Sequence, residues 1–232
     1  MLKELRLLLA SCPRPTSYEQ FQIAIVEDNV LLKNTAATRR ESFRRLRELY
    51  ALGETVILFR ALRDMWDDDH EGQSLLALLC ACARDSILRA TSDLILALVP
   101  RQSVTPQMIE EATEEAFPGR YNPTTLANVG RHAASSWQQS GHLSGRLTKT
   151  RARASPTPGA VAYALLLGHL EGVQGDSLFT TRWARLLDVP PPVLRDHARR
   201  ASQLGWLEYR HGGGITELSF HHLLRPSPEE PA

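Results

Sequence analysis

The chain has 232 residues, of which 43% are hydrophobic and 23% are charged, and its formal net charge is +1. This length is sufficient to bury a real core, and the apolar fraction excludes wholesale disorder. The total charge by itself predicts no polyanionic partner.

The charged residues are nevertheless segregated along the chain. Acidic residues gather in Asp64–Glu71 and between Glu110 and Glu115, whereas Arg120–Leu170 holds six Arg or Lys and no carboxylate side chain. A protein with one positive surface and one neutral or acidic surface has this distribution.

No targeting segment or membrane span is expected. Charged residues interrupt Met1–Arg6, and the longest apolar run, Leu75–Ala83, is far shorter than the roughly 20 residues that a span requires. We therefore expect a soluble, cytoplasmic protein that does not contact membrane. Cys12, Cys80 and Cys82 have no paired CxxC spacing, so neither disulfides nor a zinc site is expected.

A basic helix is predicted near Thr38. Thr38 and Glu41 have the spacing of a capping box, so the helix should begin within a turn of Thr38. Apolar residues then recur at helical spacing at Phe43, Leu46 and Leu49, and arginines form a separate stripe.

A shorter apolar stripe between Tyr18 and Val26 precedes this helix, and Glu27–Asn29 separates the two. The order helix, turn, basic helix predicts a helix-turn-helix unit. The alternative is a solvated face, with Arg44 paired to Glu48 and Arg45 paired to Glu41 along the helix.

Further helices are expected through the middle of the chain. Residues 55–66 predict a helix that Asp67–Asp69 ends as a solvated loop, and residues 74–99 predict one or two buried helices. Thr105 with Pro106, and Asn122 with Pro123, have the pattern of helix starts.

Within residues 143–153, Leu147 and the cations Lys149, Arg151 and Arg153 alternate with Thr148, Thr150 and Ala152, and this period of two favours an extended basic arm. A flexible basic linker before Ser155–Pro158 is the alternative. Either form can lie along a phosphate backbone.

The last third predicts a winged helix. A helix from Val161 is followed by a short strand-like link at Ser177–Phe179 and a second helix capped by Thr180 or Thr181. A third helix, residues 193–204, should turn its apolar residues inward, and Gly205 fits a left-handed cap. The inward residues expected are Val193, Leu194, His197, Ala201 and Leu204. Residues 206–220 alternate around His211–Gly214, the signature of a hairpin.

These elements predict a mainly α protein: a helical bundle with a helix-turn-helix-like N-terminal part and a C-terminal winged helix with a small β-hairpin. The predicted divisions are a helical domain over 1–102, a helical pair with a basic arm over 103–155, a winged-helix-like domain over 156–225 and a disordered tail over 226–232.

Catalytic motifs are not found. His211–Gly214 has the sequence of an esterase oxyanion loop, but the G-x-S-x-G motif that would supply the nucleophile is absent. Neither a phosphate-binding GxxxxGK[ST] loop nor a dinucleotide-binding GxGxxG loop occurs. We expect no enzymatic activity, no cofactor and no metal ion.

The stretch Tyr18–Tyr50 resembles the BrxA family of BREX bacteriophage-exclusion systems. The motifs that carry the resemblance are Glu27–Lys33, followed by Ala37–Arg40 and the Arg/Leu helix. It continues through the helix after Asn122–Pro123, through Tyr163–Gly172 and through Phe179–Leu187 with its Trp183–Leu187 motif. Each motif is short, and none is catalytic.

The resemblance implies a small, mainly helical, non-catalytic protein that acts in antiviral defence with a methyltransferase, an ATPase and a phosphatase-like protein. Members are thought to bind DNA, and part of the fold is said to be similar to the RNA-binding antitermination factor NusB. The family has also been described as an inner-membrane protein, and this sequence disagrees because it contains no span. Arg39–Arg40 is the only neighbourhood that the family pattern nominates as functional.

We therefore predict a DNA-binding accessory protein that contacts the phosphates of double-stranded DNA with little base specificity. An adaptor between BREX proteins and an RNA-binding or transcription factor are the alternatives. The DNA hypothesis requires the cations from the three parts of the chain to converge on one ridge or furrow. The predicted contact residues are Lys33, Arg39, Arg40, Arg44, Arg45, Arg47, Arg146, Lys149, Arg151, Arg153, Arg195, Arg199 and Arg200.

Overall fold

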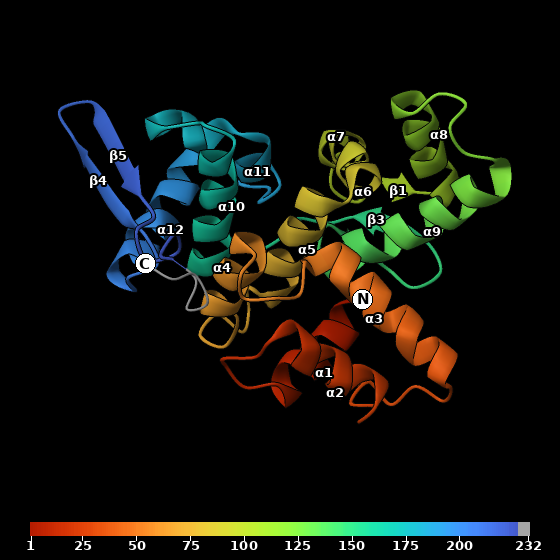
Figure 1. Ribbon diagram of the computed structural model, residues 1–232. Coiled ribbons are helices and arrows are strands. Elements are labelled where there is room, and N and C mark those ends of the chain that lie inside the picture. The colour runs from red at the N-terminus through yellow and green to blue at the C-terminus, as the bar shows by residue number, and fades with distance from the viewer. Residues whose placement is uncertain (227–232) are drawn as a thin grey trace.

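The computed structural model describes residues 1–226, which form a mainly helical protein with two small antiparallel sheets (Figure 1). The α-helices are α1 (Leu2–Ser11), α2 (Tyr18–Val26), α3 (Ala36–Tyr50), α4 (Ile57–Trp66), α5 (Gln73–Arg84), α6 (Ser86–Ala90), α7 (Ser92–Ala97), α8 (Pro106–Ala116), α9 (Pro123–Gln139), α10 (Pro158–Leu170), α11 (Arg182–Arg185) and α12 (Pro191–Gln203). A 3-10 helix, η1, spans Gly175–Thr180. The strands are β1 (Ser103–Val104), β2 (Leu143–Ser144), β3 (Lys149–Arg151), β4 (Glu208–Gly212) and β5 (Ile215–Ser219). The predicted fold class is confirmed.

The helix-turn-basic-helix order is present in α2 and α3. Helix α3 begins within a turn of Thr38, as predicted, but the capping box is formed by Thr35 and Thr38 and not by Thr38 and Glu41. The hydroxyl of Thr35 accepts from the backbone N–H of Thr38 at 3.2 Å. Glu41 is instead occupied by arginines further along the helix.

Helices α5 and α10 form the centre of the molecule. Leu75–Cys82 of α5 and Gly159–Gly168 of α10 are buried on every side, and the two helices contact each other (Figure 1). Residues 74–99 contain three helices instead of the expected one or two, because Asp85 ends α5 and its carboxylate caps α6.

One aspartate of the run after α4 is wrongly predicted as solvated. Asp69 is buried, and its carboxylate accepts from the hydroxyl of Thr157 at 2.5 Å and from the N–H of Gly72 at 3.2 Å. Because Thr157 also caps α10, this contact joins the loop after α4 to the first turn of a central helix.

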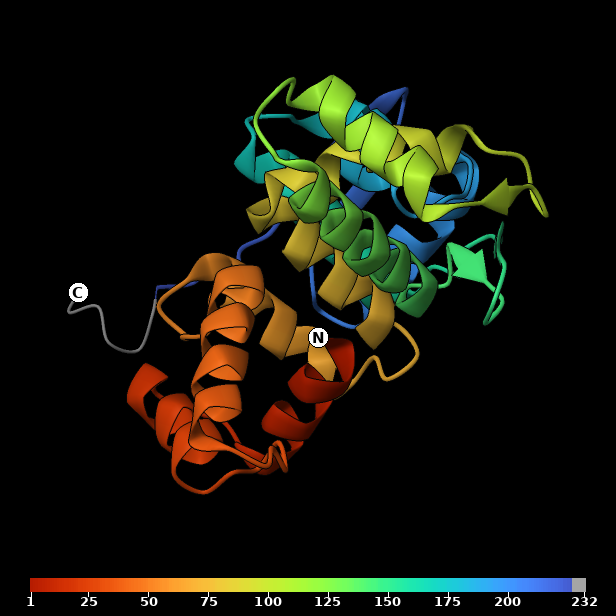
Figure 2. The ribbon, with the colours of Figure 1, turned by 90° about the vertical axis from the view of Figure 1, so that its right-hand side faces the viewer.

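Residues 143–144 and 149–151 form the strands β2 and β3, so the extended interpretation holds for these two parts of the segment. Strand β3 is central in a three-stranded antiparallel sheet of order β1-β3-β2, and Ser103 and Ser144 both pair with Thr150. Figure 2 shows this small sheet at the edge of the molecule, beside the C-terminal end of α9. Strand β1 was not predicted, because two residues are too few to show the alternation of a strand.

The C-terminal part has the predicted order with two corrections. The link at Ser177–Phe179 is not strand-like but belongs to η1. The consecutive residues Leu178 and Phe179 are both buried, whereas successive residues of a strand point to opposite faces. The inward stripe of α12 is Leu194, Ala198 and Ala201.

Two residues expected to point inward from α12 are exposed: Val193 is 37% exposed and Leu204 58%. Gly205 has the predicted left-handed conformation after α12. The hairpin is confirmed, with Gly212 opposite Ile215 and left-handed Gly213 and Gly214 at its turn.

One buried apolar cluster runs from Leu2 to Leu223, across all the predicted domain boundaries. The boundaries at 102/103 and 155/156 stay predictions. The predicted disordered tail lies outside the described residues except for Pro226, which is exposed. Among residues 1–226, none of the helices combines the length and apolar composition that crossing a bilayer requires.

Candidate nucleic-acid interface

Two of the predicted contact residues near the start of α3 are held inside the N-terminal part. The Nζ of Lys33 contacts the Glu4 carboxylate at 3.0 Å, and the Nη1 of Arg39 donates to the carbonyl oxygen of Val26 at 2.7 Å. Arg39 thereby satisfies an orphan carbonyl at the end of α2. Both side chains serve the packing of α1, α2 and α3.

Two further arginines of α3 are paired along the helix. Arg44 contacts Glu41 at 2.7 Å and Glu48 at 2.8 Å, and Arg45 contacts Glu41 at 2.6 Å. Hydrogen bonds from Arg44 and Arg45 lower the pKa of Glu41 to about 2, so its carboxylate stays charged and continues to neutralise them. The solvated-face interpretation is confirmed for these residues.

Arg40 and Arg47 are the exposed arginines of α3 that have no carboxylate partner within residues 1–226. Their spacing of seven residues places them on one face of the helix. Arg47 donates to the hydroxyl of Tyr18 at 3.3 Å, which leaves its charge uncompensated. Only part of the expected basic stripe is therefore available to a ligand.

Arg151 is not a surface cation. Its side chain is 3% exposed, and its Nη2 contacts the Asp188 carboxylate at 2.8 Å. The same guanidinium donates to the carbonyl oxygens of His142 and Ala152. Strand alternation places Lys149 and Arg151 on one face, and that face packs against the protein. The prediction that Arg151 contacts DNA is incompatible with this burial.

Four other cations surround the same small sheet, and we call Arg101, Arg146, Lys149 and Arg153 the sheet cluster. Arg101, Arg146 and Arg153 are exposed, Lys149 is half-buried with its Nζ on the side-chain oxygen of Gln138, and none has a carboxylate partner in the described part of the chain. Arg101 was missed by sequence reasoning. Its backbone N–H donates to the carbonyl of Arg151 at 2.8 Å, a pairing that only the folded chain reveals.

Hydroxyl groups occupy the outer face of this sheet. Ser103 and Ser144 both lie opposite Thr150, and the hydroxyls of Ser144 and Thr150 are 3.2 Å apart. The first two are exposed and Thr150 is half-buried. Hydroxyls and arginines are the side chains that commonly bond to phosphate oxygens.

The candidate residues of α12 are mostly neutralised. Arg195 forms a bidentate contact with the Asp176 carboxylate at 2.8 and 2.9 Å and lies over the ring of Phe179. Arg199 contacts Asp196 at 2.7 Å. Arg195 therefore braces α12 against η1. Arg200 is exposed and has no ion pair within residues 1–226.

The three groups of cations lie in different places. In Figure 1, α12 and the β4–β5 hairpin lie at one end of the molecule and α3 toward the other, with α4, α5 and α10 between them. In Figure 2, the small sheet and α3 lie on opposite sides of the view. The structure does not bring these groups onto the single ridge that the DNA hypothesis requires, so a nucleic-acid surface has to be built from one of them.

No family model, curated protein or solved structure matches the chain. Within the described range, no group of three or more His, Cys, Asp or Glu side chains is arranged to hold a metal ion. The three cysteines are free and buried.

Proposed function

We propose that this protein is a non-catalytic accessory protein of a BREX phage-defence system that binds double-stranded DNA through the phosphate backbone, with the sheet cluster as the principal contact. The observation that carries the proposal is the uncompensated charge of that cluster: its four cations have no carboxylate partner within residues 1–226, and residues 120–170 contain no acidic side chain at all. The sequence resemblance to the BrxA family supports the assignment of the protein to a BREX system.

The chemistry of the small sheet favours phosphate over bases. The sheet has exposed arginines beside it and the hydroxyls of Ser103, Ser144 and Thr150 on its outer face, and such groups position a duplex without reading its sequence. The α12 helix has the place of a groove reader in a winged helix, but the charges of Arg195 and Arg199 are already compensated. We therefore expect weak base specificity.

Titration of a labelled duplex at several salt concentrations tests the proposal. About four neutralised phosphates give a slope of about −3.6 for log K against log salt. Absence of binding at low salt, or an affinity independent of salt, would contradict it. A preference for structured or single-stranded RNA in direct competition would instead favour the RNA-binding alternative.

Three matched double charge reversals assign the contact surface. Each changes two exposed arginines to Glu: Arg146 with Arg153, Arg40 with Arg47, and Arg199 with Arg200. We expect the first pair to reduce the size of the salt slope by about 2, since each lost phosphate contact removes about 1. The other two pairs should leave the slope nearly unchanged. Equal losses from all three would disprove a principal role of the small sheet.

An adaptor role for the C-terminal part is the second candidate. The specific observation is that Val193 of α12 and Leu204 directly after it are exposed, while Arg195 and Arg199 of the same helix are compensated by carboxylates. Such a surface suits a protein partner better than a polyanion. If Val193→Ser with Leu204→Ser abolishes pull-down of the methyltransferase, ATPase or phosphatase-like BREX protein while DNA binding persists, the adaptor interpretation is favoured.

A further inference from the structure

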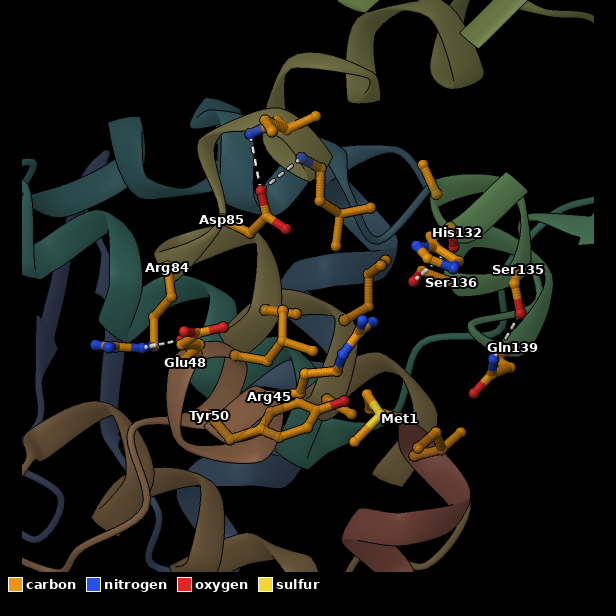
Figure 3. A pocket seen from close by; sticks show the side chains of 18 of the residues that line it. Met1, Arg45, Glu48, Tyr50, Arg84, Asp85, His132, Ser135, Ser136 and Gln139 are labelled. Carbon is orange, nitrogen blue, oxygen red and sulfur yellow. Dashed lines mark hydrogen bonds between the residues drawn. The ribbon is translucent and has the colours of Figure 1, made fainter. Parts of the chain in front are cut away.

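A groove of about 590 Å³ is lined by the start of α1 and by helices α3, α5, α6 and α9 (Figure 3). This volume is in the range of sites that bind small ligands, about 300–1,000 Å³. The groove belongs to none of the surfaces described above, although Arg44 and Arg45 of α3 contribute to its lining.

The floor of the groove is apolar. Leu78 and Ala81 come from α5, Leu88 from α6 and Ala133 from α9, and each is at most 6% exposed. Half-buried Leu49 of α3 continues this surface. The apolar area that a ligand can still cover comes mainly from Leu49 and from the half-buried Ile87 and Val129, and covering it gains about 25 cal/mol for each Å² removed from water.

The walls of the groove carry cations from separate helices. Arg45 projects from α3 into the groove, toward the side where His132 of α9 lies, and Arg84 lies at the end of α5 (Figure 3). Arg45 uses its Nε for Glu41, but its terminal nitrogens have no hydrogen-bond partner within residues 1–226. Those nitrogens remain available to an anion.

The two carboxylates that line the groove are already engaged. Glu48 pairs with Arg44 at 2.8 Å, and Asp85 accepts from the backbone N–H groups of Ile87 and Leu88. Neither contacts Arg45, whose ion pair is with Glu41 through Nε at 2.6 Å, a carboxylate that does not line the groove. Burial and then the nearby charges of Arg45 and Arg131 lower the pKa of His132, so an anion placed between Arg45 and His132 would reverse part of this shift.

We propose that this groove binds a small organic anion whose apolar or aromatic body covers Leu78 and Leu88 and whose anionic group lies between Arg45 and His132. The hydroxyls of Ser135 and Ser136 on the α9 wall supply further polar contacts. A nucleoside phosphate and an aromatic carboxylate share this chemistry.

Anilinonaphthalene sulfonate has the proposed combination of an aromatic body and an anionic group, and its fluorescence reports binding. We expect saturable binding to the folded protein, weakened at least about tenfold in Arg45→Met, which corresponds to about 1.4 kcal/mol. Arg40→Met, a change of an exposed arginine on the same helix as Arg45 but outside the groove lining, is the matched control and should bind normally. Circular dichroism and urea denaturation establish that both variants are folded.

Two pairs of competitors identify the ligand class. Deoxyadenosine 5′-monophosphate is compared with deoxyadenosine, and 1-naphthoate with 1-naphthalenemethanol. The charged member of at least one pair should displace the probe about tenfold better than its neutral counterpart and should raise the pKa of His132 measured by NMR. Displacement by the nucleotide indicates a nucleoside phosphate, and displacement by naphthoate alone indicates a carboxylate. Equal action of charged and neutral members, or unchanged probe binding in Arg45→Met, would overturn the proposal.

Discussion

Arg151 and Asp188 form an ion pair that fastens the small sheet to the turn between α11 and α12. The Arg151 Nη2 lies 2.8 Å from the Asp188 Oδ1, and the other carboxylate oxygen of Asp188 accepts from the N–H of Ala154 at 3.3 Å. The side chains are 3% and 14% exposed. An arginine from the basic segment thus connects two parts of the fold instead of binding a ligand.

Arg151→Ala should destabilise the protein by about 3–5 kcal/mol, because removing one partner leaves a buried charge without compensation. Arg153→Ala, two residues along, removes an exposed arginine and should change the free energy of unfolding by less than about 0.5 kcal/mol. Urea denaturation at pH 7 measures both. Combining Arg151→Met with Asp188→Asn should cost less than the sum of the single changes, and strict additivity would contradict the pairing.

His142 should make the protein sensitive to mild acid. It is buried with one ring nitrogen 2.8 Å from the Ser140 hydroxyl and the other 2.9 Å from the Leu186 carbonyl, and burial lowers its pKa from 6.5 to about 4. Between these two values the unfolded chain binds the proton and the folded chain does not. The contribution of His142 to the free energy of unfolding is therefore complete above pH 6.5. It is lost as the pH falls toward 4, by up to about 3 kcal/mol.

Urea midpoints at pH 7, 5.5 and 4.5 follow this loss, and His142→Gln should flatten the pH dependence across the same window. His70 is exposed, so His70→Gln is a matched control that should retain the slope. A His142→Gln variant with an unchanged slope would assign the acid sensitivity to other groups.

Gly159→Ala should destabilise the protein although alanine favours helices by about 1 kcal/mol over glycine. Gly159 lies in the first turn of α10, where an added methyl group would meet the buried carboxylate of Asp69. That carboxylate is buried and bonded to Thr157 and Gly72, so moving it aside would disturb both hydrogen bonds, and we expect a loss of about 1–3 kcal/mol. Thermal denaturation measures it.

Gly212→Ala is the matched change for Gly159→Ala in open space, because nothing lies within 4 Å of the added methyl group. It should alter stability by less than about 0.5 kcal/mol. A stabilised Gly159→Ala variant would show that the Asp69 side chain can move aside to accommodate the added methyl group.

The sequence predicts helix starts well where capping is local. Thr105 and Asn122 cap α8 and α9 as expected, since the hydroxyl or amide that caps a helix lies three residues from the N–H that it accepts. The start of α3 is harder to define, because Thr35 and Thr38 both have capping side chains. The pattern identified the second threonine and the structure uses the first.

The candidate site is less predictable because ion pairing depends on residues distant in sequence. Arg151 and Arg153 look equivalent in the basic segment, yet one pairs with an aspartate 37 residues away and the other is exposed. The compensation of Arg44 and Arg45 by Glu41 was accessible, since those residues lie within one helical turn. Sequence therefore locates the cationic segment but does not distinguish structural arginines from free ones.

Arg101 provides a direct test of whether the unpaired arginines of the sheet cluster contact DNA. It is exposed, its backbone has a left-handed φ of 72°, and it pairs with β3 through its N–H. Asparagine tolerates this conformation, so Arg101→Asn should change the free energy of unfolding by less than about 1 kcal/mol while the salt slope for duplex DNA falls in size by about 1. Arg101→Lys should retain the slope, because a lysine preserves the charge. Electrophoretic mobility shifts at several salt concentrations, compared with urea midpoints, separate binding from stability.

If Arg101→Asn binds DNA with an unaltered slope, Arg101 does not belong to the contact surface and the cluster reduces to Arg146, Lys149 and Arg153.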